Sequence, residues 1–165
     1  MPIVRIVLFL VSLCLSGLAH SALEIEISGG GAQQLPIAIV PFAQSQSGSD
    51  NPSSDNLSQI IQADLKRSGL FRLLETAGVV SRPSDISQIK YAEWVALQAQ
   101  AMAVGKVEIL PGNRFNVSFQ LVDVLKQSQL ASVQYNVTAN QLRGTAHKIA
   151  DVIYQKLTGE SGLFS

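Results

Sequence analysis

The chain has 165 residues, of which 47% are hydrophobic, and its 12 basic and 12 acidic residues leave no formal net charge. This length allows one domain or two small ones, and the apolar fraction is sufficient for a core. Nucleic-acid binding is disfavoured, because proteins that neutralise phosphate usually carry an excess of basic residues.

Residues 1–22 have the pattern of a secretory signal peptide. Arg5 is the only charge before a mainly apolar stretch from Ile6 to Leu18, and small residues follow it. The stretch is shorter than the roughly 20 residues that span a bilayer, so a membrane anchor is the weaker alternative. We expect cleavage after Ser21 or Ala22, export to the periplasm, and a mature protein that is not embedded in the membrane.

Cys14 is the only cysteine and lies within the predicted signal peptide. A bacterial lipoprotein needs a small residue before its lipidated cysteine, whereas Leu13 precedes Cys14 here. We therefore expect Cys14 to be removed on export, which leaves the mature chain without a disulfide or thiol chemistry.

An alternating segment follows the predicted signal peptide. Its apolar side chains are separated by acidic ones and the glycines at 29–31 end the pattern, so residues 23–34 are predicted as a flexible N-terminal segment. Such a segment can add itself as a strand to the sheet edge of another protein, or it can pair within its own sheet. The candidate partner-binding residues are Leu23, Glu24, Ile25, Glu26, Ile27 and Ser28.

Residues 35–165 are predicted to form one α/β domain that begins with an extended run. Leu35–Phe42 has a buried apolar centre, and Pro36 and Pro41 lie near its ends, where a missing backbone donor is tolerated. Residues 43–56 are rich in small polar side chains and are predicted as a loop.

Two helices and a short strand are predicted in the middle of the chain. The apolar side chains between residues 57 and 65 recur at helical spacing, and Gly69 is a stop signal for this helix. A strand is predicted at Phe71–Leu74, and residues 76–85 connect it to a second helix at Ile86–Leu97. The second helix is expected to bury Ile89, Trp94 and Leu97.

Three strands and a last helix complete the domain. The strands are predicted at Met102–Leu110, Phe115–Val124 and Leu130–Val137, with a tight turn at residues 111–113. Alternation in the middle strand indicates one packed and one wet face, as in an antiparallel meander.

The last helix is predicted from Thr138, which forms a capping-box pattern with Gln141, to Gly159. Its buried face is expected to consist of Leu142, Ala146, Ile149, Ala150, Ile153 and Leu157. The core is further expected to include Leu57, Ile61 and Trp94. The predicted fold class is α/β, a mixed β-sheet with helices packed on one face.

The sequence offers no set of side chains for catalysis, so we expect a protein that is not an enzyme and has no cofactor or metal. His147 lies off the apolar stripe and is expected to be solvated, and no second histidine or cysteine remains for a metal cluster. Asp50, Asp55 and Asp64 do not match a calcium-binding loop and are expected to be solvated loop acids. The glycines at 29–31 lack the spacing of a phosphate- or dinucleotide-binding loop.

Six runs together resemble the TolB family. They are PIAIVPF at 36–42, DLKRSGLF at 64–71, YAEW at 91–94, AVGKV at 103–107, FNVSFQLVD at 115–123 and YQKLTG at 154–159, with Gly162 and Phe164 after them. They cover nearly all of the predicted mature chain in order and spacing.

The resemblance implies a non-enzymatic periplasmic component of the Tol–Pal system, which ties the outer membrane of Gram-negative bacteria to the cell body and constricts it at cell division. In the family, the segment after the signal peptide binds the C-terminal domain of TolA, and a β-propeller binds the lipoprotein Pal. By position, Leu23–Ser28 is then the TolA-binding segment. The sequence stops at Ser165, where the propeller is expected to begin, so we expect Pal binding to be weak or absent.

A second resemblance leaves an alternative function open. Lipoprotein activators of penicillin-binding proteins have a similar domain with a proline-flanked first strand, and they regulate periplasmic peptidoglycan synthesis. The pair Leu13–Cys14 argues against lipidation, and the Leu-Thr-Gly ending at 157–159 favours the TolB family.

Overall fold

The computed structural model of the protein describes residues 34–45, 53–76, 78 and 81–164, which lie within one compact unit, Gln33–Ser165. The predicted signal peptide and the predicted segment at 23–28 lie outside the described residues. The elements in chain order are β1 (Leu35–Ile39), β2 (Ala43–Gln44), α2 (Ser53–Ser68), β3 (Phe71–Leu73), a 3-10 turn (Ile86–Gln88), α3 (Tyr91–Ala96), β4 (Ala101–Leu110), β5 (Arg114–Asp123), β6 (Ser128–Thr138), a second 3-10 turn (Ala139–Gln141) and α4 (Leu142–Thr158).

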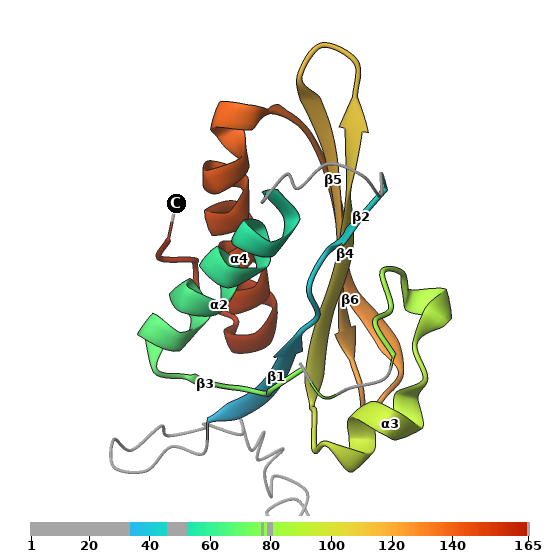
Figure 1. Ribbon diagram of the computed structural model, residues 1–165. Helices are drawn as coiled ribbons and strands as arrows, with labels where there is room; N and C mark the ends of the chain where they lie inside the picture. The colour runs from blue at the N-terminus through green and yellow to red at the C-terminus, as the bar shows by residue number, and fades with distance from the viewer. Residues whose placement is uncertain (1–33, 46–52, 77, 79–80, 165) are drawn as a thin grey trace, which may run out of the picture. The chain divides into compact units, whose positions relative to one another are not determined.

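The strands form one mixed sheet in the order β3-β1-β4-β5-β6, and the short β2 also pairs with β4 (Figure 1). Strands β3, β1 and β4 run parallel, whereas β4, β5 and β6 form an antiparallel meander. Parallel neighbours need crossover connections, and α2 provides the one between β1 and β3. The predicted fold class is therefore confirmed.

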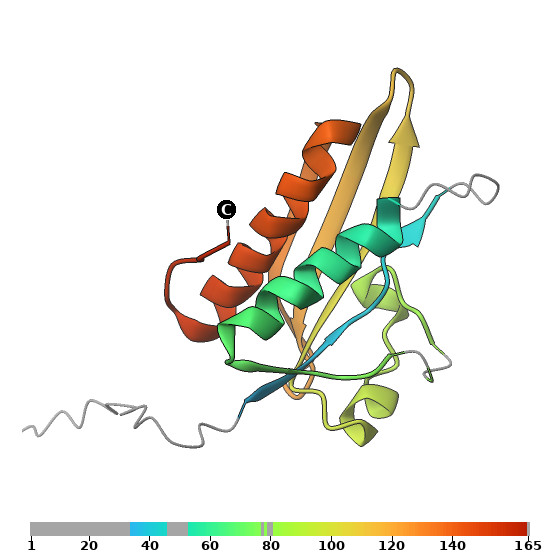
Figure 2. The ribbon, with the colours of Figure 1, turned by 60° about the vertical axis from the view of Figure 1, so that its left-hand side comes forward.

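Helices α2 and α4 lie side by side on one face of the sheet (Figures 1 and 2). Their apolar stripes cover the strand residues that point toward them, and the resulting core includes Leu57, Ile61 and Ile153, each at most 2% exposed. Burial of these three residues was predicted and is confirmed. In α4, Ala146, Ile149 and Ala150 are also fully buried, and Leu142 and Leu157 pack against the core while staying partly exposed.

A second, smaller core lies on the opposite face of the sheet. Side chains of successive strand residues point to opposite faces, so Ile37 joins the helical core whereas Ala38 joins the second one. Short helix α3 covers this second core with Trp94, which is fully buried as predicted.

The ends of the long helices follow the local signals in the sequence. Gly69 after α2 and Gly159 after α4 have φ angles of +75° and +79°, in the left-handed region that favours glycine at a helix end. The capping box of Thr138 and Gln141 is present, although it opens a 3-10 turn that leads into α4. The tight turn after β4 is also confirmed, with positive φ at Gly112 and Asn113.

Two predicted boundaries are wrong. Residues 43–56 are not all loop, because Ala43–Gln44 pairs with β4 and α2 begins at Ser53. The second helix is broken into a 3-10 turn and α3, since Ile89 between them is extended, with φ −74° and ψ 122°. The helix also ends earlier than predicted, at Ala96, so Leu97 is its C-terminal cap and is 39% exposed instead of buried.

Candidate functional site

The predicted partner-binding segment, Leu23–Ser28, lies outside the described residues, but the structure shows where the chain after it joins the domain. The side chain of Gln34 donates to the carbonyl of Gly69 at 3.0 Å, and the amide of Leu35 donates to the carbonyl of Leu70 at 2.9 Å. The start of β1 is thus fixed to the corner between α2 and β3. Five residues lie between Ser28 and Gln34, so the Cα atoms of the two can be at most about 20 Å apart.

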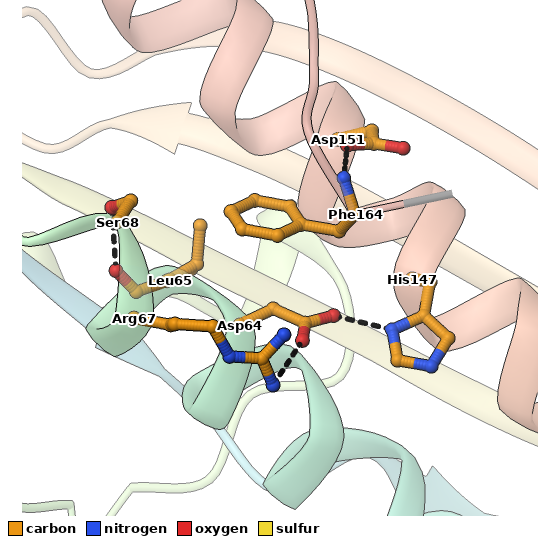
Figure 3. Close-up of polar contacts among 7 residues, drawn as sticks. All are labelled: Asp64, Leu65, Arg67, Ser68, His147, Asp151 and Phe164. Carbon is orange, nitrogen blue, oxygen red and sulfur yellow. Dashed lines mark hydrogen bonds and ion pairs between the residues drawn. The ribbon is translucent and has the colours of Figure 1, made fainter.

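Three polar side chains join α2 to α4, and we call them the α2–α4 clasp: Asp64, Arg67 and His147 (Figure 3). Oδ2 of Asp64 lies 2.5 Å from Nδ1 of His147, and its Oδ1 lies 3.3 Å from Nη2 of Arg67. Asp64 is only 1% exposed, so its carboxylate contacts the side chains of Arg67 and His147 instead of water.

The clasp corrects two predictions. Asp64 is not a solvated loop acid but a buried residue of α2, and His147 is 24% exposed and bound to it instead of solvated. Asp55 also lies in α2, while Asp50 lies outside the described residues. The spacing of Asp64 three residues after Ile61 places it on the buried face of the helix, and this signal could have identified it. No comparable local signal identifies His147, because its cover comes from the neighbouring helix.

The residues after α4 fold back onto the two helices. The amide of Phe164 donates to Oδ1 of Asp151 at 2.7 Å (Figure 3). The ring of Phe164 packs edge-on against Tyr154 at 5.9 Å between centroids, and Tyr154 packs in the same way against Phe71 at 6.2 Å. Burial, reinforced by a hydrogen bond to Glu160, raises the pKa of the Tyr154 hydroxyl.

A further polar group lies on the meander. Nζ of Lys106 is 2.7 Å from Oε1 of Glu108, and the side-chain amide of Asn116 donates to Oε2 of Glu108 at 2.9 Å. The hydrogen bond from Lys106 and then that from Asn116 hold the pKa of Glu108 below its usual value of 4.5. These contacts join β4 to β5 and give the exposed face a local ion pair.

These groups support structural roles. A carboxylate–imidazole pair orients a histidine, but nucleophilic catalysis also needs a hydroxyl or thiol at the other ring nitrogen. The hydroxyl of Ser68, about one turn along α2 from Asp64, lies away from the imidazole and donates to the carbonyl of Leu65 at 2.7 Å (Figure 3). Within the described residues, no group of three or more histidine, cysteine or acidic side chains could hold a metal ion. No helix in this part of the chain is long and apolar enough to cross a membrane.

Comparison with known proteins identifies the relatives of the chain. Residues 23–130 match the family described as the TolB amino-terminal domain. The Tol-Pal system protein TolB of Methylobacillus flagellatus is 61% identical over 150 residues, which are 91% of this chain and 34% of that protein. The protein of the same name from Thiobacillus denitrificans is 48% identical, over 89% of this chain and 33% of its own length.

A solved structure agrees with the sequence relatives. The crystal structure of TolB from Acinetobacter baumannii superimposes with a TM-score of 0.64 and 33% identity, covering 79% of this chain and 30% of that one. The chain thus spans about a third of the length of the relatives that it matches.

Proposed function

The chain belongs to the TolB amino-terminal domain family, and from this premise we propose that it acts in the Tol–Pal system by binding the C-terminal domain of TolA through Leu23–Ser28. It then works in the periplasm after loss of residues 1–22, and supports outer-membrane integrity and constriction at cell division. Binding requires no catalysis, in keeping with the structural roles of the polar clusters.

The family match carries this proposal. It begins at residue 23, so the proposed segment is part of the matched region and not an addition to it. The attachment of Gln34 and Leu35 beside Gly69 and Leu70 provides a rigid anchor, from which the preceding residues can extend to a partner. The alternating side chains of the segment suit strand addition, in which main-chain hydrogen bonds supply affinity and one side-chain face supplies specificity.

The apolar face of the segment should decide recognition. In an added strand, Leu23, Ile25 and Ile27 point to one side, and each buried side chain contributes about 1.5–3 kcal/mol. Ordering the backbone of the six residues costs roughly 1–2 kcal/mol per residue, and this cost offsets most of the free energy gained by burying the three side chains. We therefore expect weak binding, on the order of micromolar or poorer.

The test is a titration of the labelled C-terminal domain of TolA with the exported chain and two variants. Ile25→Asp places a charge in the buried face and should abolish binding, whereas Glu24→Gln alters the wet face and should change binding modestly and mainly at low salt. Deletion of residues 23–28 should abolish binding as well. Unchanged affinity of the Ile25→Asp variant or of the deletion would exclude the segment as the TolA site.

Binding to Pal is a separate part of the proposal. Since the 165 residues span about a third of the relatives, we propose that they bind Pal less well than a full-length relative does. A pull-down with Pal, with a full-length TolB as control, measures the difference, and equal recovery would contradict it. The identity to proteins named TolB favours this role over regulation of penicillin-binding proteins.

A further inference from the structure

A groove of about 530 Å³ runs between α2 and the edge strand β3. Helix α2 contributes one wall, through Gln59, Gln62, Ala63 and Lys66, and the other wall is formed by residues 71–76. Gln34 closes one side. Ala63 has a small side chain. The longer side chains around it, those of the glutamines and Lys66, can donate hydrogen bonds to a bound segment.

The outer edge of β3 offers backbone groups to this groove. The carbonyl of Leu70 and the amide of Leu74 point inward, since they bond to Leu35 and Ile37 of β1. Backbone groups of alternate residues in a strand point in opposite directions, so Phe71 and Leu73 direct their amides and carbonyls outward. β3 lies at the end of the strand order, and no described strand pairs with that outer side.

Two cations border the groove. Lys66 and Arg72 are both exposed, and within the described part of the chain neither forms an ion pair. Arg67, next to Lys66, is different, because it is bound to Asp64 of the α2–α4 clasp. Glu75 is the only acidic side chain among the residues that line the groove, so the groove carries a net positive charge.

We propose that this groove binds an extended acidic segment of a partner protein, which adds to the sheet as a strand beside β3. The outward groups of Phe71 and Leu73 supply the main-chain hydrogen bonds. Lys66 lies on the helical face of the sheet and Arg72, between two residues of the helical core, points to the other face, so they pair with carboxylates at neighbouring positions of the segment. Because β3 has only three residues, its outer edge can pair with only a few residues of an added strand. We therefore expect a weak and reversible interaction. This inference does not depend on the TolA-binding role of residues 23–28.

The experiment is an NMR titration of the ¹⁵N-labelled chain with two blocked hexapeptides. In one peptide two neighbouring glutamates are flanked by valines, and in the other two glutamines take their place. The glutamate peptide should produce saturable shifts at Gln34, Ala63 and the amides of 71–76, and it should bind about two- to fivefold more tightly for each charge that is paired.

Matched variants separate charge from backbone pairing. Lys66→Gln combined with Arg72→Gln, both exposed positions, should remove the preference for the glutamate peptide. Arg143→Gln combined with Lys156→Gln removes the same charge from exposed positions of α4 and should leave the preference intact. Leu73→Pro removes an outward amide without touching a bond to β1, and should weaken both peptides equally; if it fails to fold, the two glutamine pairs still decide the question.

Three results would overturn the proposal. The first is the absence of saturable shifts along the groove, or their appearance along β6 instead. The second is equal affinity for the two peptides. The third is a change of the groove signals by Ile25→Asp without added peptide, because the groove would then be occupied by residues 23–28 of the same chain and not by a partner. TolA binding, measured separately, can succeed or fail independently of all three.

Discussion

Asp64 on α2 and His147 on α4 are 83 residues apart in the sequence, yet Oδ2 of Asp64 lies 2.5 Å from Nδ1 of His147. This contact joins the two helices that cover the sheet, and the aromatic packing around Tyr154 joins α4 to β3 and to the residues after α4. The clasp therefore makes a direct prediction about stability.

Replacing His147 by Ala should lower the free energy of unfolding by about 1–3 kcal/mol, because the buried carboxylate of Asp64 loses a hydrogen-bond partner. Urea denaturation followed by the fluorescence of the single tryptophan, Trp94, measures the change. Lys148→Ala, at the exposed neighbouring position, is the control and should have little effect. Equal midpoints for the two variants would show that the clasp does not stabilise the fold.

The helical core should be sensitive to cavities. Ile61 and Ile153 are both fully buried, so truncating either to Ala should cost about 2–5 kcal/mol. This is a large part of the roughly 5–15 kcal/mol expected for a domain. Gln155→Ala, at an exposed position of α4, is the control. Denaturation midpoints that stay unchanged in both isoleucine variants would contradict the observed packing.

Two glycines should respond in opposite directions to alanine. At Gly162 an added Cβ would overlap the side chain of Asp151, so Gly162→Ala should displace the residues after α4 and weaken the Phe164 contact. At Gly144 an added Cβ meets nothing within 4 Å, so Gly144→Ala should stabilise α4 by about 0.5–1 kcal/mol. Thermal unfolding and ¹⁵N relaxation of residues 160–164 test both changes; a common direction of the two effects would refute the argument.

The ion pair on the meander predicts a dependence on acid. The pKa of Glu108 is lower in the folded state than in the unfolded chain, because Lys106 and Asn116 bond to its carboxylate. Its contribution is therefore present above the usual value of 4.5 and is lost as the pH falls through the lower folded value. The effect should be small, since Lys106 is half-exposed and salt screens the pair.

Measuring unfolding free energies from neutral pH to pH 3 tests this dependence. The wild type should exceed Glu108→Gln in stability near neutrality, and the difference should shrink on acidification. Glu75→Gln removes the same charge at an exposed position away from the meander, and it is the control variant. If the difference in unfolding free energy between the wild type and Glu108→Gln grew as the pH fell, the bonds from Lys106 and Asn116 to Glu108 could not explain it.

Export should remove the first 21 or 22 residues. Arg5, the apolar stretch after it and the small residues up to Ala22 motivate this prediction. Intact mass spectrometry of the periplasmic fraction should find a chain that begins at Ala22 or Leu23. A chain that retains Met1 in the inner membrane would contradict it and favour an anchor.

The sequence and the structure point to different candidate sites for binding a partner. Alternation made Leu23–Ser28 a candidate for strand addition to a partner or for pairing within its own sheet, and this remains a prediction because the segment lies outside the described residues. The groove beside β3 had no counterpart in the sequence analysis. Lys66 and Arg72 belong to different elements, and only their folding around Gly69 brings both to one groove.

The sequence by itself determined most elements of the domain and their ends. Capping at Thr138, the stops at Gly69 and Gly159, and the buried stripe of α4 depend on residues within a few positions of one another, so local patterns suffice to predict them.

Only the tertiary structure decided which helix faces meet and what they bury. The end of α3 at Ala96 left Leu97 exposed, and the packing of α4 on α2 buried Asp64 against His147. The return of the chain after Gly159 placed the amide of Phe164 on Asp151. These contacts join segments that no periodic pattern relates, because periodicity specifies which face of an element is buried but not which other element covers it.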